Sequence, residues 1–528
     1  MKGTGTLVRL ALRRERLVAP AWILVVVMLA TGLISYITTY FPTQQELAVY
    51  AETIGRNPIF LAIGGPVPEP SLGAMAAQRS GGLLYLLAGL AALLSVVRHT
   101  RAEEENGRLE LLAAGAIGRR APVAAALLVA GLTSLVAGAL TTAALVARGI
   151  EPTGSIAYGA SITAAGWVFA AIAAVAAQLV RRGRTVTTIS LSALGVAYAL
   201  RYLGDATGLP WLTYLSPLGW SHLVRAYAEE RWWMLAVPVI AAAVLAAVAC
   251  ALVARRDLGG GLLPERAGPA GAPSLRGPIS LAWRLNRGLL AKWTAGVTMA
   301  ALVFAGVSNL TPQLADQPGH ILQGFLHRYG GPSGSPVDAY LWLILLLFAY
   351  TVALFPVLMV QRLRAEESSG RAEAVLAAGV SRIGWAGGHV VVAALGTAGL
   401  LVVGGGVTGV VYSLVMGDLG TDLPRIVGAA AGHVPAAWLV GAVAVLAYGM
   451  VPRAAVAISW AVWAVVFVCG DLLGPLVGLW GWSRVEPFHY VPNTVSGEPY
   501  TMAPVVLGVL SALLLGLGLV GLRRRDLQ

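Results

Sequence analysis

Long apolar runs separated by short polar segments dominate the chain. A helix that crosses the roughly 30 Å hydrocarbon core of a bilayer needs about 17 to 25 predominantly apolar residues. Runs of suitable length lie at residues 20–40, 80–97, 122–147, 156–180, 186–203 and 234–254, and again at 293–309, 339–360, 386–416, 426–450, 454–473 and 502–522. The pattern therefore predicts an all-α polytopic membrane protein with about twelve transmembrane helices.

The composition fits this pattern and excludes a water-soluble protein. Of 528 residues, 57% are hydrophobic and only 12% are charged, whereas soluble proteins carry about a quarter charged residues. In a soluble protein the net charge of +12 would suggest a nucleic-acid ligand. In a membrane protein basic residues instead report orientation, so we expect the lipid bilayer as a partner and no nucleic acid. Cys250 and Cys469 lie inside apolar runs and are expected to be packing residues.

Basic residues fall mainly on one side of the predicted spans. If the N-terminus is cytoplasmic, most of the 37 Lys and Arg lie in inner segments, which is the positive-inside pattern. The abundance of Ala, Gly, Val and Arg is typical of a high-GC bacterial genome. We therefore predict a multi-pass protein of the bacterial inner (cytoplasmic) membrane with both termini in the cytoplasm. Residues 2–18 are expected to form an amphipathic helix on the inner leaflet. The run at 20–40 has no cleavage site behind it, so we expect it to be a retained signal anchor.

The second half of the chain repeats the first. The segment R-A-E-E-E-N-G-R-L-E that begins at Arg101 returns as R-A-E-E-S-S-G-R-A-E at Arg364, and the R-D-L that begins at Arg256 returns at Arg525. Each copy holds six spans, so both copies begin on the same side and the repeat is parallel. We predict a first transmembrane half (1–258), a Gly/Pro-rich cytoplasmic linker (259–278) and a second transmembrane half (279–528), each half with an amphipathic helix and six spans.

The sequence lacks the motifs of an ATPase. A P-loop wraps phosphates with glycine amides and needs a Lys followed by Ser or Thr, but Lys2 and Lys292, the two lysines of the chain, stand in no such motif. We therefore expect no ATPase site, no enzyme activity and no cofactor in this chain. No H-E-x-x-H or paired His spacing occurs, so a metal site has no support.

Deeply placed charges are also missing from the predicted spans. Ion-coupled carriers usually place Asp, Glu or His in the membrane, where a charge persists for function. Acidic residues in this chain stand at span ends (Asp205, Asp338, Asp422 and Asp471), and His433 is expected to be a packed, neutral side chain. The pattern argues against proton coupling.

A short, highly charged segment follows the second span of each half. A solvated loop that obeys topology rules would explain its arginines but not its acids, because acidic residues contribute little to orientation. A docking surface for another protein explains both. The candidate residues are Arg101, Glu103, Glu104, Gly107 and Glu110 in the first copy and Arg364, Glu366, Glu367, Gly370 and Glu373 in the second.

This pattern, E-E-x-x-G-R-x-E followed by a Leu/Ala-rich turn, resembles the coupling-helix segment of ABC-2-type transporter permeases. The duplicated layout and the R-R-D-L ending are similar to actinobacterial tetronasin-type or polyketide-antibiotic exporter permeases, with a type V ABC exporter-like fold. The resemblance implies that the charged segments seat in two copies of a separate ABC ATP-binding protein, which carries ATP and Mg. Many ABC-2 permeases have a Pro after the turn, where this chain has Ala116 and Val380.

The resemblance also implies a transport path. The second and fifth spans of each half would face a central cavity, where aromatic residues could stack on a substrate; each is equally well explained by packing against lipid or helices. Re-entrant segments between the fifth and sixth spans would form an outer gate. The cavity candidates are Tyr85, Tyr198, Tyr350, Trp460, Trp463 and Phe467, and the gate candidates are Pro217, Trp220, Pro487 and Tyr490.

Three functions fit the sequence. The first is the permease subunit of an ATP-driven exporter of hydrophobic or amphipathic small molecules, as in antibiotic efflux and multidrug resistance. The second is a proton-coupled drug antiporter, and the third is a non-transporting membrane sensor or scaffold. The duplicated acidic segment and the missing P-loop favour the first.

Overall fold

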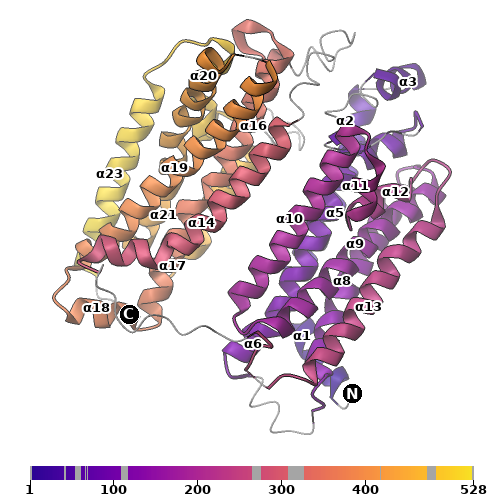
Figure 1. Ribbon diagram of the computed structural model, residues 1–528, viewed down its shortest axis with the longest axis horizontal. Coiled ribbons are helices and arrows are strands. Elements are labelled where there is room, and N and C mark those ends of the chain that lie inside the picture. The colour runs from indigo at the N-terminus through magenta and orange to yellow at the C-terminus, as the bar shows by residue number, and fades with distance from the viewer. Residues whose placement is uncertain are drawn as a thin grey trace. The chain divides into compact units, whose positions relative to one another are not determined.

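A computed structural model of the chain describes residues 3–525 apart from 41–42, 54–60, 63, 66, 68, 109–116, 258, 264–274, 307–325, 417 and 472–482. All regular elements in this described part are helices, so the protein is an all-α membrane protein (Figure 1). The chain divides into two compact units, Met1–Gly268 and Pro269–Gln528. Their boundary lies within the predicted linker.

Unit 1 is built around its fourth span, α9. The long helices are α1 (Thr4–Arg14), α2 (Val18–Tyr40), α5 (Leu72–His99), α8 (Ala121–Val146), α9 (Pro152–Leu179), α10 (Gly183–Thr207) and α13 (Ala236–Val253). The shorter ones are α3 (Gln44–Thr53), α6 (Arg101–Glu105), α11 (Pro210–Leu215), α12 (Gly219–Leu223) and η1 (Trp232–Leu235). Helix α9 packs against α5, α8 and α13. It is rich in buried Ala, Gly and Ser, small residues that let neighbouring helices approach closely.

Unit 2 repeats this arrangement. Its helices are α14 (Pro278–Ala305), α16 (Pro336–Val352), α17 (Leu354–Ser368), α18 (Arg371–Ala377), α19 (Arg382–Met416), α20 (Leu419–Gly432), α21 (Val434–Met450), α22 (Ala455–Cys469) and α23 (Ala503–Arg524), with short 3₁₀ turns η3 (Gly331–Ser333), η5 (Ser483–Val485), η6 (Pro487–Tyr490) and η7 (Thr494–Ser496). The first span packs against the third in both units (α2 on α8, α14 on α19). The fourth packs against the second and the last (α9 and α21).

The number of spans is smaller than the twelve we predicted. In the described residues, ten helices are long and apolar enough to cross a membrane, or eleven if the bent pair α1–α2 counts as one span. Two of the predicted runs are not among the ten: 20–40, whose helix α2 counts only together with α1, and 454–473. The helix of the latter run, α22, has 15 residues, which is short of the 17 or more that a crossing needs.

The two units differ at their first helix because of one proline. Helices α1 and α2 meet at an angle of 66°, whereas α14 continues without a break through the corresponding sequence. Pro20 lies just after the bend, and Ala291 holds its place in unit 2. A proline ring clashes with the carbonyl four residues earlier, which here is that of Arg16, so the helix breaks in unit 1 alone. The separate amphipathic helix expected in each half is therefore found in unit 1, and in unit 2 it is the start of α14.

Glycines allow a close contact between α19 and α20 in unit 2. A Cβ added at Gly405 of α19 would lie 2.4 Å from the Cβ of Ala430 on α20, and one at Gly409 would lie 2.8 Å from Leu423. At Gly406, one residue along, an added Cβ would meet nothing within 4 Å. The G-x-x-x-G at 405–409 is therefore a packing motif between α19 and α20.

Adjacent alanine substitutions test this contact. Gly405→Ala should lower the free energy of unfolding by about 1 to 3 kcal/mol, because the added methyl overpacks a filled interface. Gly406→Ala should leave it unchanged or raise it, since alanine is the better helix former. Thermal unfolding of the two purified variants measures the difference, and equal stability would contradict the proposed packing.

Candidate functional site

The second glutamate of the charged segment in unit 1 forms a buried ion pair with the end of the last span. Arg256, just after α13, binds the Glu104 carboxylate through both terminal nitrogens, at 2.5 Å and 3.0 Å. Its Nε donates to the side-chain oxygen of Gln178, near the end of α9, at 2.7 Å. The Glu104 and Arg256 side chains are 7% and 5% exposed. Two-point contacts of this kind are the strongest ion pairs that proteins make.

The corresponding residues of unit 2 form the same pair. Arg525 binds Glu367 through both terminal nitrogens, at 2.9 Å and 2.8 Å, and both side chains are mostly buried. Tyr448, near the end of α21, donates its hydroxyl to the same carboxylate, and the Arg525 guanidinium lies over its ring at 4.8 Å. We call the pairs Glu104–Arg256 and Glu367–Arg525 the latches of units 1 and 2.

Each latch is also attached to the third span. Arg119, two residues before α8, donates to the backbone oxygen of Arg256. Arg382, at the start of α19, donates to the backbone oxygen of Arg525 at 2.5 Å. The segment after the second span is thus joined to the ends of the third, fourth and sixth spans in both units.

The other acids of the segment lie closer to the surface. Glu103 contacts Arg14 at 2.5 Å and Arg108 at 3.5 Å, and the corresponding Glu366 contacts Arg371 at 2.8 Å. Glu105 of unit 1 has no acidic counterpart, because Ser368 takes its place. Its carboxylate accepts the backbone N–H of Gly183 at 2.8 Å, at the N-terminus of α10, where the helix dipole favours negative charge.

The segment turns back at a glycine in both units. Gly107 and Gly370 have φ values of 68° and 72°, in the left-handed region that glycine adopts without strain. The side chains around these turns (Asn106, Arg108, Ser368 and Ser369) are exposed, as is Glu373.

These positions refine the predicted docking surface. Glu104 and Glu367 point into the latches, and Arg101 is buried, donating to the carbonyl of Ala177 at 2.5 Å and to Glu104 at 2.7 Å. Glu110 lies outside the described residues, and Arg364 is half-buried. Sequence reasoning missed the partners Arg256, Arg525, Arg119, Arg382, Gln178 and Tyr448. The repeated R-D-L and the matching positions of Arg119 and Arg382 were the available signal.

The aromatic residues predicted to face a cavity gather in unit 2 only. Phe467 lies edge-on to Tyr350, with ring centroids 5.9 Å apart, and is stacked on Trp463 at 5.2 Å. Trp460, 40% exposed, contacts Trp463 at 6.1 Å. In unit 1, Tyr85 is buried beside Tyr158 and His222, whereas Tyr198 contacts Tyr202 and Arg201. That these residues contact a substrate stays a prediction.

The predicted gate residues lie in short turns before the last spans. Pro217 is half-buried between α11 and α12, and the indole of Trp220 donates to the carbonyl of Tyr214 at 2.6 Å. In unit 2, Pro487 is buried at the start of η6, and Tyr490, 48% exposed, donates to the carbonyl of Arg484 at 2.8 Å. Nothing in these contacts tests a gating role.

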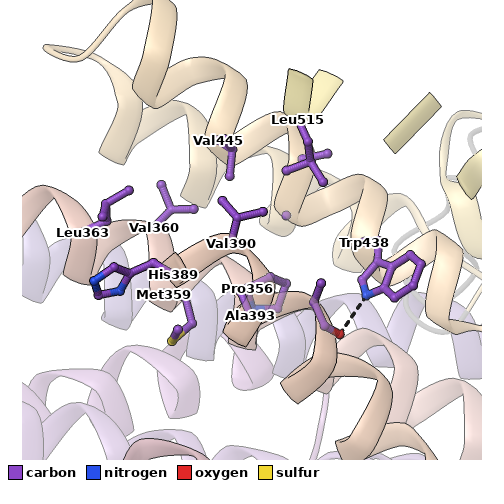
Figure 2. Close-up of a pocket in the computed structure, with 13 residues that line it drawn as sticks. Pro356, Met359, Val360, Leu363, His389, Val390, Ala393, Trp438, Val445 and Leu515 are labelled. Carbon is purple, nitrogen blue, oxygen red and sulfur yellow. Dashed lines mark hydrogen bonds between the residues drawn. The ribbon is translucent and has the colours of Figure 1, made fainter. Parts of the chain in front are cut away.

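An apolar cavity with a volume of about 30 Å³ lies among α17, α19, α21 and α23 of unit 2 (Figure 2). Figure 2 shows Met359, Val390 and Val445 lining it from three helices, with the indole of Trp438 bonded to the carbonyl of Ala394 at 3.0 Å. His389 is the one titratable residue in the lining. None of the predicted aromatic residues lines this cavity, which is much smaller than the roughly 300 to 1,000 Å³ of small-molecule sites.

Two comparisons place the chain among known proteins. A profile of the family described as "Multidrug efflux system permease Rv1217c, C-terminal domain" matches residues 275–523, which lie within unit 2. The chain is also 41% identical over 532 residues to the multidrug efflux system permease protein Rv1217c of Mycobacterium tuberculosis (strain ATCC 25618 / H37Rv). That match covers 100% of this chain and 95% of the relative.

Adjacent glutamates provide a matched test of the latch. Glu367→Gln should lower the free energy of unfolding by about 3 to 5 kcal/mol, because it leaves Arg525 buried without a counter-ion. Glu366→Gln removes an ion pair with an exposed arginine and should cost at most about 1 kcal/mol. Thermal unfolding in detergent measures both, and an effect of equal size would show that the latch is not a buried ion pair in solution.

Proposed function

The chain belongs to the family of the multidrug efflux system permease Rv1217c, and from this premise we propose that it is the membrane-spanning subunit of an ATP-driven exporter of hydrophobic or amphipathic compounds. It would lie in the bacterial inner membrane with both termini in the cytoplasm, and separate ATPase subunits would supply ATP and Mg. The chain itself is a permease subunit, not an enzyme.

The observation that carries the proposal is the duplicated latch. In each unit one ion pair joins a short charged segment to the last span, and neighbouring bonds join it to the third and fourth. Because buried ion pairs are held tightly, a force applied to the segment would act on several spans at once. Two such segments favour two copies of the ATPase, one for each unit.

The part of each segment outside the latch is the proposed docking surface, where the arginine side chains are 55% and 58% exposed and the glutamate side chains 13% and 14%. Glu103 and Glu366, with Arg108 and Arg371 beside them, occupy corresponding positions outside the latches. The ion pairs that these residues form are within reach of solvent, so an approaching protein could exchange them for contacts of its own. We therefore assign docking to the first glutamate of each pair and transmission to the second.

The lining of the apolar cavity in unit 2 favours a hydrophobic cargo, although the cavity would have to widen before it could hold one. Its lining is aliphatic and aromatic apart from His389, whose Nδ1 lies 3.2 Å from the side-chain nitrogen of Asn286. A surface of this kind favours apolar parts of a molecule and offers little to a sugar or an inorganic ion. Hydrophobic drugs and lipids are the cargo classes that fit.

A proton-coupled antiporter is the second candidate, and one observation favours it. Glu486, in the turn before the last span, is buried against Tyr350 of α16. Sequence reasoning searched for such acids only inside the predicted spans and therefore missed this one. The latches have no evident role in proton coupling, so the ATP-driven exporter remains our conclusion.

Charge reversal tests docking apart from folding. Glu103→Arg combined with Glu366→Arg should leave a folded permease, because partly exposed ion pairs contribute little to stability, yet it should abolish co-purification with the proposed ATPase subunit. Glu69→Arg changes an exposed acid elsewhere in unit 1 and serves as the control. Unchanged co-purification and transport in the double variant would exclude docking at these residues.

Filling the cavity tests its role in transport. Val390 lines the cavity, whereas its neighbour Val391 is 40% exposed and faces away from it. Val390→Trp should reduce export of a bulky hydrophobic dye at least fivefold, and Val391→Trp should leave it near the wild-type rate. Transport assays in everted vesicles decide this, and an equal rate for both variants would mean that the cargo does not use the cavity.

A further inference from the structure

Glu486 is a buried carboxylate with one oxygen unsatisfied. Its side chain is 1% exposed. Oε1 accepts the hydroxyl of Tyr350 at 2.5 Å and the backbone N–H of Asp471 at 3.1 Å. The backbone N–H of Phe488 also lies close enough to stabilise the carboxylate, but Oε2 is buried without a hydrogen bond of normal geometry. Buried polar atoms are nearly always bonded, so an exception calls for an explanation such as a missing ligand.

The bases near Glu486 are bonded to another acid. Arg328 binds Oδ1 of Asp471 at 3.0 Å, and His489 binds Oδ2 at 3.2 Å. Within the described part of the chain, no Lys, Arg or His forms an ion pair with Glu486. A buried anion is costly unless it is protonated or paired with a cation. The Glu486 carboxylate could therefore bind a cation from outside the protein.

Aromatic rings gather beside this carboxylate. Tyr350, which holds Oε1, has Phe488 at 4.8 Å and Phe467 at 5.9 Å between ring centroids. The rings of Trp463 and Phe467 are stacked. His433, 6.3 Å from Phe488, has its Nε2 buried without a partner as well. Faces of aromatic rings attract organic cations, most strongly where water is excluded.

The corresponding residue in unit 1 is a serine and offers no carboxylate that could bind a cation. Ser216 precedes Pro217 as Glu486 precedes Pro487. The Ser216 hydroxyl donates to the carbonyl of Ala197 at 2.5 Å and accepts the N–H of Gly219 at 3.0 Å, so its bonds are satisfied within the unit. The buried acid is therefore a feature of unit 2, not of the repeat.

We propose that Glu486 and the aromatic rings around Tyr350 form a recognition site for an organic cation, such as a protonated amine or a quaternary centre with apolar substituents. This proposal rests on the proposed exporter function and narrows its cargo, because such a site would favour lipophilic cations. The carboxylate supplies the charge, the Tyr350 hydroxyl orients it and the rings contact the substituents.

The site predicts a dependence on pH. Burial raises the pKa of Glu486, in the loop between α22 and α23, to about 7. A permanent cation binds the ionised carboxylate, so its affinity should rise as the pH increases from 6 to 8. Tyr350, Asp471, Arg328, His489 and His433 are the other titratable groups nearby, and comparison with a Glu486 variant separates their contribution.

The test is equilibrium binding to the full chain in lipid nanodiscs without any ATPase. The probes are tetraphenylphosphonium, a permanent cation, and triphenylphosphine oxide, a neutral compound with similar rings. Glu486→Gln should weaken binding of the cation at least tenfold and change binding of the neutral probe less than twofold. Glu69→Gln, an exposed acid of unit 1, should behave as the wild type with both probes.

Two results would overturn the site: equal affinity of the cation for the wild type and Glu486→Gln, or a wild-type affinity for the cation that is constant from pH 6 to 8. If Glu486→Gln unfolds and binds neither probe, the pH dependence of cation binding to the wild type becomes the test of the site. Binding is measured without ATP, so failure of the exporter proposal in a transport assay would leave this result standing.

Discussion

A buried glutamate–arginine pair, present once in each unit, fixes the end of the bundle to which the charged segments attach. Removing an ion pair from water is expensive, and the cost is recovered only when the contact is bidentate and the remaining donors are bonded. The latch of unit 1 meets this condition through Gln178, whereas in unit 2 Tyr448 bonds the carboxylate and the Nε of Arg525 is buried without a partner. The rest of the site follows from this constraint, because the charged segment can turn outward only beyond the glutamate that is held.

The two adjacent glutamates of each segment look alike in the sequence, but they have different surroundings and different proposed roles. Successive helical residues point in directions about 100° apart, so one glutamate of each pair faces the bundle and the other its surface. In the proposed complex with an ATPase, the partner would exchange contacts at Glu103 or Glu366 while Glu104 and Glu367 keep the segment attached to the spans. This is how one short segment could serve for both attachment and transmission.

Sequence patterns predicted the helical fold and most spans, because apolar runs of membrane length have few other solutions. They could not reveal that α22 is short or that Pro20 bends the first helix in one unit only. The charged segments were found from the repeat, but their burial was not, since it depends on arginines more than 150 residues away in unit 1 and unit 2 alike. Glu486 was missed because it reaches a buried position from a loop. The units are thus similar in packing and unequal in chemistry, with the cavity and the buried acid in unit 2.

The most direct test of the account is transport by the purified permease and its ATPase in proteoliposomes. The account predicts uptake of a hydrophobic dye that requires both proteins and Mg-ATP and that persists when an uncoupler collapses the proton gradient. Uptake driven by a proton gradient without ATP, and abolished by the uncoupler, would contradict it and assign the buried acid a coupling role instead.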